Sequence, residues 1–210
     1  MANTVITIAR QYGSGGKTVG RMLSEDRGIH FYNREILRLA SDASGISEEI
    51  FGANDEVIKK SILQRIAKKI SIGDVLPPDS DDFLSTTNLF NYQAKVIRQL
   101  AETESCVIVG RCADFILKDY DNVVRVFVHG PYDFCLEQAM RVNAKPENEM
   151  RKLMEKRDKY RGEYYKHYTG QNWYDARNYD LCLDSSKLGF EGCVEAIKAY
   201  MAVRGLSIEK

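Results

Sequence analysis

The sequence predicts an α/β protein in which a mostly parallel sheet of five strands is covered by helices on both faces, as in a three-layer sandwich. Short β-branched and apolar runs alternate along the chain with segments of helical periodicity. Two of these runs, 106–109 and 123–128, are almost wholly apolar, as expected of strands buried on both faces. A length of 210 residues fits one domain, 1–210, with room for insertions.

Five strands are expected, each a short run rich in β-branched or apolar residues: 4–9, 29–32, 106–109, 123–128 and 179–183. Helices are expected from about Gly16, Arg34, Phe90, Asp133 and Phe190. The second of these stretches, 34–70, breaks near Ser44-Gly45, and the helical stretch 133–160 breaks around Pro146. The segment between the second and third strands is too long for a simple crossover, so 34–100 is expected to form a helical insertion at one end of the sheet.

One part of this insertion bears on assembly. Isoleucines recur every four residues, at Ile58, Ile62, Ile66 and Ile70, and so share one face of a helix. That face can pack in the core or against a second subunit. The pattern therefore leaves two alternatives open, a monomer in which this face is part of the core and a homo-oligomer in which it forms an interface.

Composition narrows the function classes. Lys plus Arg and Asp plus Glu number 30 each, so nothing in the net charge favours nucleic acid or a membrane surface as a partner. Apolar stretches fall far short of the roughly 20 residues of a membrane span, and no signal peptide is recognised. The five cysteines include no Cys-x-x-Cys pair, which argues against structural zinc and for reduced thiols. A cytoplasmic protein with small-molecule partners is expected.

The strongest motif is the run 11–18, Gln-Tyr-Gly-Ser-Gly-Gly-Lys-Thr, between a predicted strand and a predicted helix. Glycines let successive backbone N–H groups converge on phosphate oxygens, and the helix N-terminus adds about half a positive charge. The motif indicates a phosphate-binding loop for ATP formed by Gly13, Ser14, Gly15, Gly16, Lys17 and Thr18. Lys17 would bridge the β- and γ-phosphates, and the Thr18 hydroxyl would bind Mg²⁺. Gln11 stands where the usual pattern has glycine, so an ordinary glycine-rich turn is the alternative.

A second basic segment lies at 156–161, Lys-Arg-Asp-Lys-Tyr-Arg. Arg157 and Arg161 are four residues apart and share a helix face, on which two guanidinium groups can clamp a multiply charged anion. Phosphoryl transfer requires this kind of cationic stabilisation. The alternative is a solvated basic helix that Asp158 neutralises internally.

A third segment, 109–114, follows a buried strand, where ligands bind in open parallel sheets. Arg111 therefore lies where the phosphate of an acceptor could bind. Pairing of Arg111 with Asp114 is the structural alternative.

These segments, in this order, resemble the cytidylate kinase-like family, relatives of bacterial cytidylate kinase among the P-loop nucleoside monophosphate kinases. The similarity runs over nearly the whole chain, through 8–16, 31–37, 107–114, 161–170 and 179–185. It implies a P-loop NTPase fold with an acceptor-binding insertion at about 34–100 and a lid at about 150–175. It also implies ATP and Mg²⁺ as cofactors and CMP or dCMP as the acceptor.

The resemblance gives roles to individual residues. Lys17, Arg157, Asp158 and Arg161 match catalytic positions. Arg111, Asp114 and Arg34 match the acceptor side. In cytidylate kinase proper an aspartate precedes the Gly-Arg pair, where this chain has Val109. Mg²⁺ would then rest on Thr18, ATP and water, with Asp114 or Glu35 as further candidates.

Three functions follow as hypotheses. The leading one is an ATP-dependent kinase for CMP or dCMP. A kinase for another small metabolite uses the same parts with a different insertion. A non-catalytic nucleotide-binding protein is the third, because of Gln11 and Val109.

Overall fold

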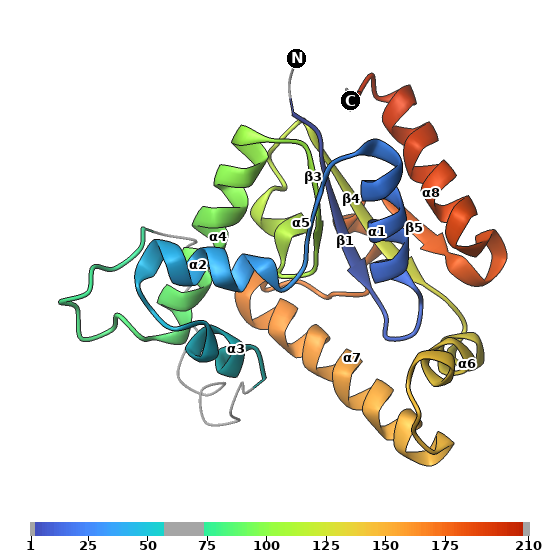
Figure 1. Ribbon diagram of the computed structural model, residues 1–210, viewed down its shortest axis with the longest axis horizontal. Coiled ribbons are helices and arrows are strands. Elements are labelled where there is room, and N and C mark those ends of the chain that lie inside the picture. The colour runs from blue at the N-terminus through green and yellow to red at the C-terminus, as the bar shows by residue number, and fades with distance from the viewer. Residues whose placement is uncertain (1–2, 57–73, 208–210) are drawn as a thin grey trace.

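The computed structural model describes residues 3–56 and 74–207. Five strands form one sheet in the spatial order β2-β3-β1-β4-β5 (Figure 1). All neighbouring strands are parallel, so the sheet is wholly parallel where the sequence predicted it to be mostly so. The strands are β1 (Val5–Arg10), β2 (His30–Tyr32), β3 (Cys106–Val109), β4 (Val123–His129) and β5 (Leu181–Asp184).

Helices cover both faces of the sheet (Figure 1). They are α1 (Gly16–Arg27), α2 (Glu35–Ser44), α3 (Glu48–Glu56), α4 (Thr86–Thr103), α5 (Ala113–Ile116), α6 (Tyr132–Val142), α7 (Glu147–Thr169) and α8 (Ser185–Val203), with a 3₁₀ turn, η1 (Ala176–Asn178). Alternate side chains of each strand point to opposite faces. Ile6 and Ile8 of β1 pack with α1 and α8, whereas Val5 and Ala9 pack with α2, α4 and α5. The three-layer prediction is confirmed.

Three helix boundaries differ from the sequence prediction by four residues or more. Helix α8 begins at Ser185, five residues before the expected Phe190, and the Asp184 side chain caps it. Helix α4 begins at Thr86, four residues before the expected Phe90, because the Ser85 side chain accepts a hydrogen bond from the Asn88 N–H and caps the helix. Helix α7 continues to Thr169, beyond the expected end at 160. The isoleucine repeat at 58–70 lies outside the described residues.

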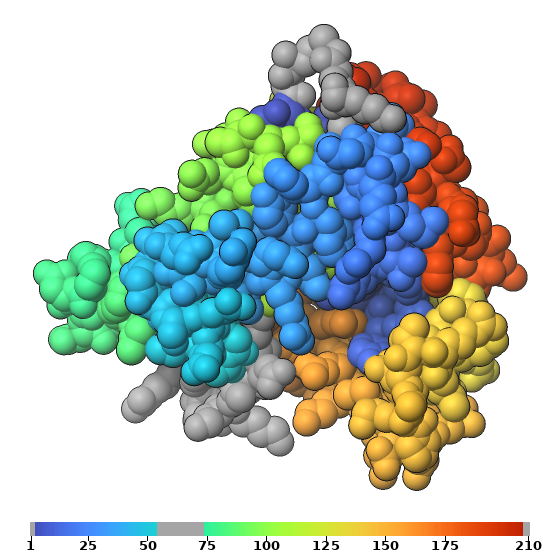
Figure 2. All heavy atoms as spheres, in the orientation of Figure 1, coloured from blue at the N-terminus to red at the C-terminus, as the bar shows by residue number. Residues whose placement is uncertain are grey.

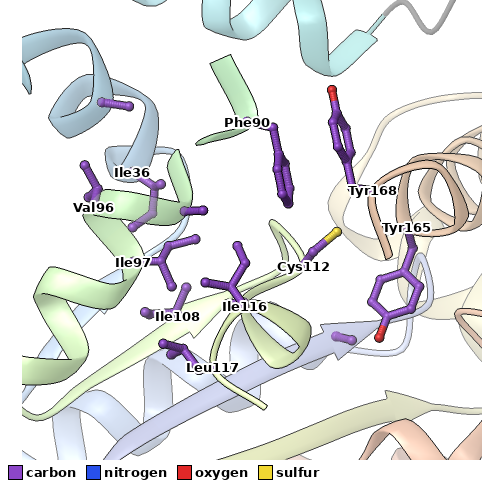
Figure 3. Close-up of a cluster of buried hydrophobic side chains, with 14 of the residues drawn as sticks. Ile36, Phe90, Val96, Ile97, Ile108, Cys112, Ile116, Leu117, Tyr165 and Tyr168 are labelled. Atoms are coloured by element: carbon purple, nitrogen blue, oxygen red, sulfur yellow. The ribbon is translucent and has the colours of Figure 1, made fainter. Parts of the chain in front are cut away.

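The C-terminal half of α7 belongs to the core. Tyr165 and Tyr168 of α7 belong to the core cluster, in which Tyr168 lies alongside Phe90 of α4 and the ring of Tyr165 points away from Phe90 (Figure 3). The rings of Phe90 and Tyr168 stack with their centroids 4.0 Å apart. Any movement of a lid is therefore expected in the charged N-terminal half of α7, since its C-terminal half is anchored by aromatic packing.

Candidate active site

The β1–α1 turn has the backbone geometry of an anion-binding loop. Gly15 caps α1 with φ 77°, and Gly13 has φ 80°, a region that glycine adopts without strain. The N–H groups of the first turn of α1 have no partner within the helix, so they are available to an anion. A Cβ on Gly13 would lie 2.0 Å from the carbonyl oxygen of Cys135, and one on Gly15 would lie 2.1 Å from the ring of Phe190. Only glycine fits at these two positions.

Serine hydroxyls fix the carbonyl side of the loop. The buried Ser14 Oγ lies 3.0 Å from the Gln11 carbonyl oxygen and 2.9 Å from that of Val128. The Ser185 Oγ lies 2.8 Å from the carbonyl oxygen of Ser14. Ser14 was predicted as a phosphate ligand, but its hydroxyl points into the protein and holds the loop to β4.

Gln11, at the position where glycine is usual, has a structural role. Its side-chain oxygen accepts a hydrogen bond from the Gly130 N–H at 3.2 Å, and its own N–H donates to the Val128 carbonyl at 3.1 Å. The side chain thereby joins the loop to the β4–α6 turn. This contact explains how a long polar residue fits at that position.

Helix α7 is docked on the loop through Asp158. Both carboxylate oxygens of Asp158 accept from the Tyr12 N–H, at 2.9 and 3.0 Å, and one pairs with Arg161 at 2.8 Å. Burial raises the pKa of the Asp158 carboxyl, against the opposing effects of Arg161 and the Tyr12 N–H. The helix is therefore not a solvated basic helix, although Asp158 does neutralise Arg161.

A cavity of about 1050 Å³ opens beside this loop, beyond the carboxyl ends of β1 and β3. The surface is hollowed where the first turn of α1, the α2 region and α7 meet (Figure 2). Seven of the described lining residues are cationic: Arg10, Lys17, Arg34, Arg111, Lys145, Arg157 and Arg161. Six residues predicted for the site line this cavity: Lys17, Arg34, Arg111, Asp114, Arg157 and Arg161. Gly13, Ser14, Gly15, Gly16, Thr18 and Asp158 are not among its lining residues. The lining has an excess of positive charge suited to phosphate groups.

Arg10 and Lys145 are the two cationic lining residues that the sequence interpretation missed, and Arg10 is the buried one. It ends β1, directly before the phosphate loop, and its guanidinium lies against Gly110. Burial, with Arg161 and Arg111 nearby, lowers the pKa of Arg10 to about 9, so the group stays charged at neutral pH. The signal was available, because β1 is a predicted inner strand and ligands bind beyond the carboxyl ends of such strands.

The turn after β3 is strained. Gly110, Arg111 and Cys112 all have positive φ, at 79°, 63° and 54°. For the two residues with side chains this conformation costs about 1–3 kcal/mol each. Such strain is retained where the surroundings fix it and where geometry serves function, and here it aims Arg111 into the cavity.

Asp114 lies deeper than its predicted role in acceptor binding suggests. It is 3% exposed at the cavity wall, and its carboxylate accepts a hydrogen bond from the Tyr165 hydroxyl at 2.6 Å. Burial raises the pKa of Asp114 to about 6. Its hydrogen-bond partner is Tyr165 of the core, so Asp114 joins α5 to α7.

The residues present fit an ATP triphosphate. Lys17 is exposed in the first turn of α1 and faces the cavity, and Arg157 and Arg161 approach from α7. Thr18 is exposed one residue further along α1. Among the described residues no group of three or more His, Cys, Asp or Glu could hold a metal ion. Mg²⁺ would therefore be held chiefly by phosphate oxygens, water and the Thr18 hydroxyl.

A family model described as the cytidylate kinase-like family matches residues 5–187. The chain belongs to the cytidylate kinase-like family. No curated protein matches it. Membership of this kinase-like family supports a phosphotransferase that uses ATP and Mg²⁺, and the resemblance seen in the sequence is confirmed.

Solved structures agree on the fold of this family member. An uncharacterized protein from Eubacterium ventriosum is 26% identical with a TM-score of 0.70, and the match covers 95% of this chain and 99% of that one. Shikimate kinase from Bacteroides thetaiotaomicron is 12% identical with a TM-score of 0.54, over 95% and 98% of the two chains. The second match bears on the fold alone. No helix in the described ranges is long and apolar enough to cross a membrane.

Proposed function

We propose that this protein transfers the γ-phosphoryl group of ATP to a nucleoside monophosphate, with CMP or dCMP as the first candidates. The observation that carries the proposal is one cavity lined by Lys17 of the phosphate loop, two α7 arginines and Arg111. Two phosphorylated substrates carry several negative charges between them. The seven cationic side chains of the lining would balance those charges.

The donor half rests on the phosphate loop. The N-terminus of α1 and Lys17 would bind the β- and γ-phosphates, and ATP supplies the transferred group. Arg157 and Arg161 enter from α7 and would stabilise charge on the equatorial oxygens during transfer. Asp158 would orient these arginines, because it already holds Arg161 and the loop.

The acceptor half rests on Arg111 and on the insertion. Arg34, the N-cap residue of α2, lines the cavity together with Leu37, Glu48 and Gly52. In this arrangement Arg111 and Arg34 would hold the acceptor phosphate, and α2 and α3 would contact the remainder. The protein's work is positioning, since phosphoryl transfer needs two oxygens brought into line and little covalent help.

The test is ADP release from ATP and Mg²⁺ with CMP, dCMP, UMP, AMP and GMP in turn. Lys17→Ala is expected to remove turnover while leaving the circular dichroism spectrum unchanged. Lys159→Ala is the matched control, because Lys159 lies on α7 with its side chain 75% exposed and pairs only with Glu163 at 4.0 Å in the described structure. ADP release that persists in Lys17→Ala would contradict the donor assignment.

A second candidate is a kinase for another small anionic metabolite. Val109, buried and at the cavity wall, stands where cytidylate kinase proper has an aspartate, and this difference favours a changed acceptor. A screen of metabolite extracts by ADP release separates the two candidates. If calorimetry shows tight ATP binding and no acceptor is turned over, the result would instead support a non-catalytic nucleotide-binding protein.

A further inference from the structure

The cavity contains a buried hydroxyl with no hydrogen-bond partner. Tyr164 of α7 is 7% exposed and lines the cavity, yet its hydroxyl oxygen has no partner in the part of the chain that the structure describes. Its ring packs edge-on against Phe90 and tilts toward Tyr168, with centroids 6.4 and 4.7 Å away. Packing therefore explains why an aromatic ring is present at this position, but it does not explain why the ring carries a hydroxyl.

An orphaned hydroxyl costs folding free energy that phenylalanine would avoid. Burial raises the pKa of Tyr164 well above its usual value, so the hydroxyl stays protonated and can donate. The charge of Arg111 acts directly on this group. A donor held beside a guanidinium at a cavity wall is suited to an anionic ligand.

Arg10 approaches the same place from the other side. The Nη1 atom of Arg10 lies 2.5 Å from where a Cβ would stand if Gly110 were replaced by alanine. The Cβ atom of Arg10 lies 2.4 Å from where a Cβ would stand at Gly16. The side chain thus runs from the base of the phosphate loop to the β3 turn. Asp158 raises the pKa of Arg10, and Arg161 shares that carboxylate. The local charge remains positive.

We propose that Arg10 and Tyr164 flank Arg111 in one anion-binding site, where the Arg10 guanidinium and the Tyr164 hydroxyl donate hydrogen bonds to the anionic group of the acceptor. The site is separate from the phosphate loop, which binds the donor. Arg111 is the shared neighbour, since its charge acts on both Arg10 and Tyr164. The assignment of this anion to the acceptor rests on the proposed function, whereas the site itself requires only an anion.

The test titrates inorganic phosphate into the full-length protein by calorimetry, with and without a saturating non-hydrolysable ATP analogue. With the analogue bound, Tyr164→Phe is expected to weaken phosphate binding about tenfold. Arg10→Gln is expected to weaken phosphate binding by at least about tenfold. Arg10→Lys is expected to weaken it by less, because lysine keeps the positive charge but cannot donate two parallel hydrogen bonds. Tyr164→Phe is also expected to melt at the same or a higher temperature than the wild type.

Matched controls exist for both substitutions. Tyr168→Phe removes a hydroxyl that donates to the Thr86 carbonyl at 3.2 Å, one turn further along α7. Arg141→Gln removes an exposed arginine of α6 that pairs with Glu137. Both are expected to bind phosphate as the wild type does.

Any of four outcomes would overturn the proposal. Phosphate affinity could be unchanged in Tyr164→Phe, the ATP analogue could abolish phosphate binding, or Tyr164→Phe could melt well below the wild type and so reveal a structural partner. Wild-type protein that binds no phosphate at all would overturn it as well. None of these measurements requires turnover. A kinase assay that fails with every acceptor would therefore contradict the proposed function and leave the anion-binding site to be judged by the phosphate titrations.

Discussion

Replacement of Asp114 by asparagine is expected to change how stability depends on pH. Burial raises the pKa of Asp114 from the ordinary 3.8 to about 6 in the folded protein. Because the folded-state pKa is the higher one, the stabilising contribution is complete below pH 3.8 and is lost as pH rises through 6. At about 1.4 kcal/mol per pKa unit, ionisation of Asp114 costs the folded state about 3 kcal/mol by pH 7.5. Asparagine does not ionise and so avoids this cost.

Asparagine also keeps the local contact, because its carbonyl oxygen can accept the hydrogen bond from the Tyr165 hydroxyl that Asp114 accepts at 2.6 Å. Urea unfolding of Asp114→Asn and wild type from pH 4 to 7.5 measures the effect. The free-energy difference, variant minus wild type, should rise by about 2 kcal/mol across that range, because part of the cost is already present at pH 4. Tyr165→Phe should raise the pH at which Asp114 titrates, because the Tyr165 hydroxyl stabilises the ionised carboxylate and the variant lacks it. A difference that stays constant with pH would refute the reasoning.

Two further substitutions test the phosphate loop. Asp158→Ala removes the acceptor of the Tyr12 N–H and the partner of Arg161, and urea unfolding should show a loss of about 2 kcal/mol, with faster proteolysis of α7. Gly13→Ala places a Cβ 2.0 Å from the Cys135 carbonyl oxygen at φ 80°, so it should cost at least about 2 kcal/mol and weaken ATP binding in calorimetry.

Each has a control in the same protein. A Cβ on Gly162, inside α7, meets nothing within 4 Å, so Gly162→Ala should be neutral or stabilising. Lys159→Ala, next to Asp158, should leave stability within about 0.5 kcal/mol of the wild type. Equal losses in variant and control would show that the loop contacts contribute nothing specific.

The local parts of this site were predictable from sequence. A β-branched strand, three glycines, Lys17 and a helix specify the loop through backbone geometry alone, and the structure starts α1 at the expected Gly16. The i, i+4 spacing of Arg157 and Arg161 likewise placed both at the cavity. These features depend on neighbours within a few residues.

The remainder depends on partners far away in the chain. Nothing near Ser14 indicates that its hydroxyl turns toward Val128, 114 residues later. The contact between Asp158 and the Tyr12 N–H joins residues 146 positions apart. The ring of Tyr164 packs against Phe90, but the unpaired state of its hydroxyl is apparent only when the surrounding atoms are in place.

The way the loop is fastened has a consequence for biosynthesis. Ser185, which binds the Ser14 carbonyl, lies 171 positions after it in the chain, and Phe190, which packs on Gly15, comes later still, so both are translated well after the loop. A ribosome-bound nascent chain that ends before α8 therefore lacks both contacts. ATP binding should appear abruptly when α8 leaves the exit tunnel, and a stalled-chain series would place the gain of nucleotide binding within this helix.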